Sequence, residues 1–80
     1  MSHVAHEIYE EFPEEAKKIE ALKQVDPHFS KLVDDYHEVN RQVYRADARL
    51  DVMAEDAEHE LRHQRLQLKD EIFRLLHAAA

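Results

Sequence analysis

Apolar residues recur at steps of three and four along the middle of the chain. The series is Phe29, Leu32, Tyr36, Val39, Val43, Ala46 and Leu50. This spacing places the side chains on one face of a long helix and is typical of a helix that packs along another helix. Asp26 can cap the helix start, and Pro27 fits its first position. We therefore expect a helix from Pro27 to about Leu50.

Two further helices are predicted on either side of this one. Residues 14–24 are strong helix formers that follow Pro13, which predicts a short helix over about 13–24 with Ile19 and Leu22 on its apolar edge. A third helix is expected over about 56–77 and has an apolar series of its own. Its members are Leu61, Leu68, Ile72 and Leu75. Residues 1–11 are expected to be an N-terminal extension, so 12–80 form the single domain.

The connection between the two long helices is weakly signalled. Residues 48–55 contain no glycine or proline, so one continuous helix over 27–77, roughly 75 Å long, is an alternative. A seam continued past Leu50 soon becomes polar, however. The residues at its later positions are Glu60, Gln64 and Gln67. We therefore favour an antiparallel hairpin that folds back near Met53 and places Val39 opposite Leu68.

The third helix carries more apolar surface than a hairpin can bury. Leu66 and Phe73 lie roughly 120–140° around the helix from Leu61, with Leu76 between the two sets. Either the first helix folds over this second stripe through Ile19 and Leu22, or another subunit covers it, and we favour the subunit. The interaction face expected from this pattern consists of Leu66, Lys69, Phe73 and Leu76.

The fold class expected is all-α. The chain is predicted to form an antiparallel two-helix, coiled-coil-like hairpin with a short N-terminal helix, and to assemble as a homodimer or a larger helical bundle. With 80 residues and no cysteine, it has a small core and no disulfide to reinforce it, and self-association is a common remedy.

The charge and composition of the chain make some kinds of binding partner unfavourable. The formal net charge of −7 disfavours nucleic acid and anionic membrane surfaces. No apolar run approaches the roughly 20 residues of a membrane span, and the first residues do not resemble a secretory signal. We expect a cytoplasmic protein whose partners are its own copies or another, unidentified protein.

Two segments form a recognisable pair. They are FSKLVDDYHEVNRQVYR at 29–45, with Asp26 and Pro27 just before it, and QRLQLKDEIFRLL at 64–76. Together they resemble the small bacterial YdcH-like proteins, a family first catalogued as a domain of unknown function. The resemblance implies a short, coiled-coil-like helical hairpin and no assigned activity. Family members often have a glycine-rich loop between the long helices, whereas this chain has residues 48–55 there.

Candidate chemistry is sparse. His59 and His63 are one turn apart and can chelate a divalent metal, so a metal-binding protein using surface histidines and carboxylates is the alternative function. On the helical wheel both histidines point away from the Leu61 seam, which favours the interpretation that they are solvated. Asn40 and Arg65 are polar at or beside seam positions, where such residues can fix register and oligomeric state. The sequence predicts no cofactor and no enzymatic activity.

Overall fold

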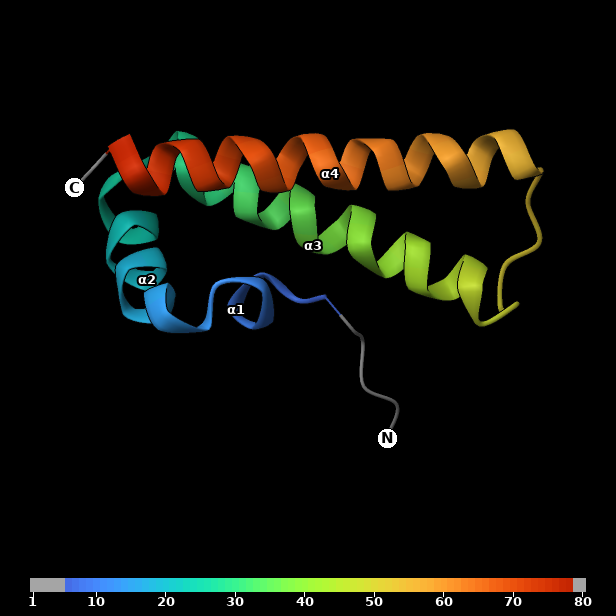
Figure 1. The fold of residues 1–80 in the computed structure, drawn as a ribbon, viewed down its shortest axis with the longest axis horizontal. Helices are drawn as coiled ribbons and strands as arrows, with labels where there is room; N and C mark the ends of the chain where they lie inside the picture. The colour runs from blue at the N-terminus through green and yellow to red at the C-terminus, as the bar shows by residue number, and fades with distance from the viewer. Residues whose placement is uncertain (1–5, 79–80) are drawn as a thin grey trace.

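The structure is a computed structural model that describes residues 6–78. Its elements are α1 (Ile8–Glu11), the 3₁₀ turn η1 (Pro13–Glu15), α2 (Ala16–Val25), α3 (Pro27–Asp47) and α4 (Glu55–Ala78). Helices α3 and α4 run side by side in opposite directions (Figure 1). Helix α2 lies beneath the end of this hairpin where α3 begins and α4 ends, and α1 lies farther toward the middle of the hairpin. The described part of the chain contains no strand. The prediction of an all-α fold is therefore confirmed.

Helix α3 begins where the sequence predicted. The Asp26 side chain accepts hydrogen bonds from the backbone N–H groups of His28 at 3.0 Å and Phe29 at 3.2 Å. These bonds satisfy two of the donors that a helix start leaves unpaired. Pro27 occupies the first turn, where its missing N–H costs nothing.

The break between α3 and α4 is made by a helix-ending motif without glycine. Arg49 adopts a φ of 62°, the left-handed conformation that glycine usually supplies at this position. The N–H of Leu50 reaches back to the carbonyl of Arg45 at 2.8 Å, and that of Arg49 reaches Ala46 at 3.1 Å. The Arg45 guanidinium also donates two hydrogen bonds to the Asp51 carboxylate, from Nε at 2.9 Å and from Nη2 at 3.0 Å. Because of this motif, α3 ends at Asp47 and not at the predicted Leu50.

The buried face of α3 is rotated relative to the predicted seam. Its buried residues are Phe29, Val33, Tyr36, Asn40, Val43 and Ala46. Leu32 and Val39, which the seam placed at its centre, are only partly buried, whereas Val33 and Asn40 are buried in addition. The cause is a second neighbour, because α3 packs against α1 and α2 as well as α4.

The N-terminal helices belong to the core. Ile8 of α1 and Ile19 of α2 are fully buried, in one cluster with Tyr36, Ile72 and Leu76. Ile8 falls within the predicted extension, so packing begins well before residue 12. Residues 1–5 of that extension and 79–80 of the predicted domain lie outside the described residues.

Candidate functional site

The outer face of α4 keeps two large apolar side chains in contact with solvent. Leu66 is 51% exposed and Phe73 is 49% exposed. They are seven residues apart, which places them two turns apart on the same side of the helix. We call these two residues the α4 outer patch. They are two of the four residues that the sequence assigned to an interaction face.

Aromatic rings extend the patch at its Phe73 end. The Phe73 ring lies 5.8 Å from that of Phe12 and 4.1 Å from that of His77, measured between ring centroids. The His77 ring also forms a 2.9 Å hydrogen bond with the Phe73 carbonyl. Phe12 belongs to residues 6–15, which we call the N-terminal segment. This segment therefore supports one edge of Phe73 but leaves about half of its surface open.

Leu76 does not lie on this face, contrary to the sequence-based assignment. It is fully buried in the core cluster with Ile19 and Ile72. Leu76 lies on α4 between the seam and the outer patch, and it shares the core cluster with Ile19 of α2. Part of the surplus apolar stripe is therefore buried within the chain, and Leu66 and Phe73 remain exposed.

Lys69 joins α4 to the N-terminal segment. Its Nζ donates to the Glu11 carboxylate at 3.1 Å, and the two side chains are 35% and 23% exposed. Burial opposes ionisation of Glu11, but the hydrogen bonds and charges of Lys69 and His6 together outweigh it, so the pKa of Glu11 lies below its ordinary value. Lys69 therefore has a structural partner within the chain.

Asn40 and Arg65 meet inside the hairpin. The Arg65 Nη1 donates to the Asn40 Oδ1 at 3.0 Å, and Asn40 is only 1% exposed. Their hydrogen bond joins the middle of α3 to the middle of α4. The structure brings together the two polar residues that the sequence singled out for register, and that role stays a prediction.

The histidine pair proposed for metal lies on the solvent side of α4. His59 and His63 are both exposed, and the neighbour of the His59 ring is Glu55 at 3.6 Å. Within residues 6–78 no group of three His, Cys, Asp or Glu side chains is placed to hold a metal ion. A two-histidine chelate on an exposed helix lacks the further ligands that a structural metal site uses.

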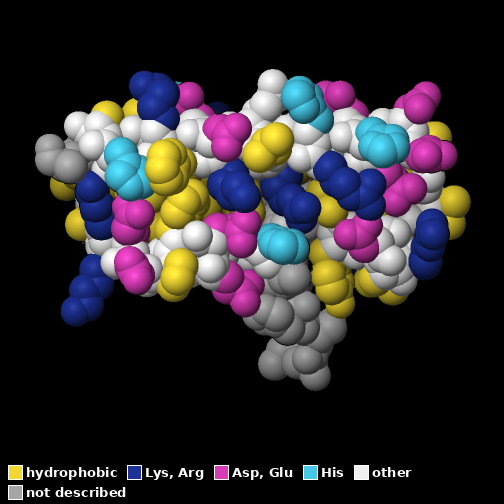
Figure 2. All heavy atoms as spheres, viewed as in Figure 1, with side chains coloured by type: hydrophobic (Ala, Val, Ile, Leu, Met, Phe, Trp, Pro, Cys, Tyr) yellow, Lys and Arg dark blue, Asp and Glu magenta, His cyan; other side chains and the backbone are white. Residues whose placement is uncertain are grey.

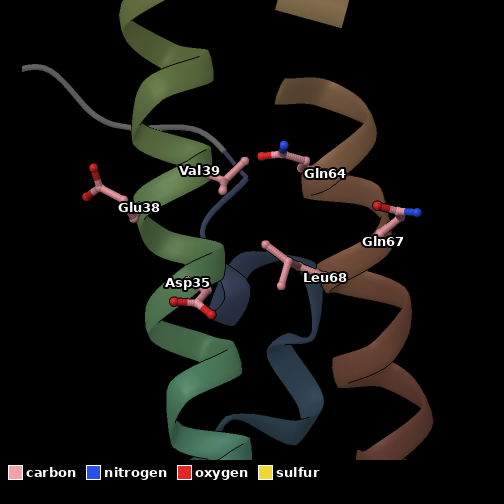
Figure 3. A pocket seen from close by; sticks show the side chains of 6 residues that line it. All are labelled: Asp35, Glu38, Val39, Gln64, Gln67 and Leu68. Carbon is pink, nitrogen blue, oxygen red and sulfur yellow. The ribbon is translucent and has the colours of Figure 1, made fainter. Parts of the chain in front are cut away.

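An open groove of about 410 Å³ runs between α3 and α4 on another side of the hairpin. Val39 and Leu68 form its floor, and they point into the space between the helices in Figure 3. Its rim carries Asp35, Glu38, Gln64 and Gln67. The rim side chains offer hydrogen bonds and negative charge, but the groove brings no nucleophile together with a base.

Sequence reasoning missed the contacts made by the N-terminal segment. The Tyr36 hydroxyl donates to the His6 carbonyl at 2.6 Å, and the Glu7 carboxylate lies 2.5 Å from the His37 ring. Burial raises the pKa of Tyr36 to about 12. The one available signal was the i, i+4 spacing of Glu7, Glu11 and Glu15, which places three carboxylates along one side of a helical segment.

Comparison with known proteins places the chain in a family. The sequence model of a family described as "Protein of unknown function (DUF465)" matches residues 29–76, and the chain belongs to that family. The match covers the α3–α4 hairpin and leaves α1 and α2 outside it. No curated protein and no solved structure matches this chain. In the described residues, no helix is both long and apolar enough to cross a bilayer.

Proposed function

We propose that this member of the DUF465 family is a protein–protein interaction module that self-associates through the α4 outer patch. The observation that carries the proposal is the half-exposure of Leu66 and Phe73 two turns apart on one helix face. The same helix buries Ile72 and Leu76 completely on its inner side. An amphipathic helix that is apolar on more than one side is suited to a second neighbour.

The apolar surface that Leu66 and Phe73 can bury determines how strongly two copies associate in this proposal. Burying a large apolar side chain contributes about 1.5–3 kcal/mol, so covering the open halves of both residues contributes a similar amount per copy. Association in solution costs at least roughly 4 kcal/mol. The patch therefore supports reversible, concentration-dependent association of two or more copies, with additional contacts from its surroundings.

The test is light scattering behind a sizing column over a hundredfold range of concentration. We expect the mass to rise with concentration for the natural chain and to stay at that of a monomer for Leu66→Glu combined with Phe73→Glu. Helix content measured by circular dichroism should be unchanged, because neither side chain belongs to the buried core.

A matched control adds the same two charges elsewhere. Val25 and Val52 are 76% and 100% exposed, so Val25→Glu combined with Val52→Glu should associate like the natural chain. Equal mass for both double variants at every concentration would refute the proposed interface.

A further inference from the structure

A polar cavity lies between the N-terminal segment and α4. Its volume is about 160 Å³, and the described residues around it include three cations, Arg62, Arg65 and Lys69, and one carboxylate, Glu11. The three cations follow one another at steps of three and four, which places them along one side of α4. Figure 2 shows a row of Lys and Arg side chains across the middle of this face, with acidic and His side chains immediately below.

The charge of this cavity is opposite to that of the chain. The chain carries a formal charge of −7, whereas the cations lining the cavity outnumber its carboxylate. A local excess of positive charge in an acidic protein attracts small anions, although the Glu11 carboxylate in the same wall opposes their entry. The anion must fit within a space that holds only a few non-hydrogen atoms.

The cations retain donors that can be directed into the cavity. The bond from Arg65 to Asn40 uses Nη1, one of the five N–H donors that a guanidinium carries. The bond from Lys69 to Glu11 uses one of three ammonium donors. Arg62 is more heavily engaged, since it pairs with both Asp47 and Glu58. Arg65 and Lys69 therefore carry most of the site.

We propose that this cavity binds a small phosphate-type oxyanion, held by Arg65 and Lys69 with help from Arg62, and that Glu11 is its built-in competitor. Guanidinium and ammonium groups donate strong, charge-assisted hydrogen bonds to phosphate oxygens. The Glu11 carboxylate already occupies the position of such an anion, 3.1 Å from the Lys69 Nζ. An oxyanion that enters the cavity takes over this bond from Glu11.

Glu11 is a replaceable occupant because its bond to Lys69 is only partly buried. Both side chains keep contact with solvent, and ion pairs of this kind hold their partners weakly. The pKa of Glu11 lies below its ordinary value because the hydrogen bonds and charges of Lys69 and His6 together outweigh the effect of burial. The carboxylate is thus charged near neutral pH and competes with any other anion for the same donor.

The experiment titrates inorganic phosphate into the full chain and follows the backbone amide resonances of α4 by NMR. Ionic strength is held constant with sodium chloride, so that screening does not change during the titration. We expect saturable shifts around residues 62–69. Lys69→Gln should weaken phosphate binding about tenfold, because one charge-assisted donor is lost, and Glu11→Gln should tighten it several-fold.

The opposite directions of these two changes separate a binding site from a structural ion pair. Both variants break the same bond between Lys69 and Glu11, so a merely structural role predicts the same effect for both. Lys31→Gln is the matched control, because Lys31 pairs with Asp35 at 3.1 Å on α3 and lies outside the cavity. Its phosphate affinity should equal that of the natural chain.

Three outcomes would overturn the proposal. They are the absence of saturable shifts with millimolar phosphate, an equal loss of affinity in Lys31→Gln and Lys69→Gln, and unchanged or weaker binding in Glu11→Gln. Should Lys69→Gln fail to fold, judged by its circular dichroism, Arg62→Gln replaces it and must weaken binding in the same direction. Leu66 lines this cavity as well as forming part of the α4 outer patch. The titration is therefore made at a concentration at which light scattering shows a monomer, so that self-association does not change the phosphate affinity that is measured.

Discussion

At the scale of single residues, the contact between Asn40 and Arg65 is the most specific feature of the hairpin. The sequence showed that both are polar at or beside seam positions, and the expected register, with Val39 opposite Leu68, places Arg65 opposite about Val43. The structure pairs it with Asn40 instead. A helical wheel gives the side of a helix on which a residue lies, and a long flexible side chain then chooses its acceptor from several within reach. That choice depends on packing that the pattern does not contain.

Asn40→Leu should destabilise the protein by about 1–3 kcal/mol, because it leaves a partly buried guanidinium without its acceptor. Arg65→Met in the same chain should restore much of the loss, since removing both polar partners is far less costly than removing one. Urea unfolding of the two single variants and the double variant gives the coupling energy, which we expect to lie at about 0.5–3 kcal/mol.

A double-mutant cycle on a solvent-exposed ion pair is the control for this measurement. Lys31 and Asp35 are one turn apart on the exposed side of α3, and their coupling should be about 0.3–0.5 kcal/mol. If the pair of Asn40 and Arg65 couples no more strongly than this, then it contributes nothing specific to the hairpin and its predicted role in register fails.

At the scale of elements, the packing of the N-terminal segment could not be predicted from the sequence. A four-residue helix such as α1 is not stable by itself, so its sequence gave little reason to predict a packed element. Its order comes from partners elsewhere in the chain. Carboxylates in and around α1 contact side chains far along the chain: Glu7 with His37, Glu11 with Lys69, and Glu15 of η1 with His77.

Ile8→Ala tests whether this segment is part of the fold. Ile8 is 0% exposed, and removing a buried isoleucine side chain costs about 2–5 kcal/mol. We therefore expect a drop of that size in the free energy of unfolding by urea. Val52→Ala, at a fully exposed position, should change it by less than about 0.5 kcal/mol. A similarly small effect of Ile8→Ala would mean that the segment does not pack on the hairpin in solution.

At the scale of the whole molecule, the all-α class was predictable from the sequence. The packing of three layers, namely α1 with α2, then α3, then α4, was not. The heptad-like spacing predicted two long helices, and the cap at Asp26 predicted the start of the first. The hairpin break depends on Arg49 taking a conformation that no residue type in 48–55 announces. The layer formed by α1 and α2 packs through Ile8 and Ile19. These two side chains can be buried only against the α3–α4 hairpin, so their own sequence neighbours do not predict the contact. Because the family match covers the hairpin alone, α1 and α2 are the part of this fold that it does not describe.

Tyr36 joins all three layers, and its hydroxyl should make the stability of the whole molecule sensitive to alkaline pH. The side chain is fully buried in the core cluster, and its hydroxyl donates to the carbonyl of His6. Burial raises its pKa from 10.0 to about 12, so the folded chain keeps this proton after the unfolded chain has lost it. The contribution is therefore complete below about pH 10 and disappears as pH rises toward 12.

Urea unfolding at a series of pH values from neutral to strongly alkaline measures this effect. The free energy of unfolding should fall more steeply above pH 10.0 in the natural chain than in Tyr36→Phe, which has no proton to lose there. Tyr36→Phe should also cost about 0.5–1.5 kcal/mol at neutral pH through the lost hydrogen bond.

Burial raises the pKa of Tyr9 as well, so the free energy of unfolding of Tyr36→Phe still falls somewhat at alkaline pH. Tyr44→Phe keeps Tyr36 and should follow the natural chain; identical slopes in the Tyr36 and Tyr44 variants would contradict the buried, carbonyl-bound position of the Tyr36 hydroxyl.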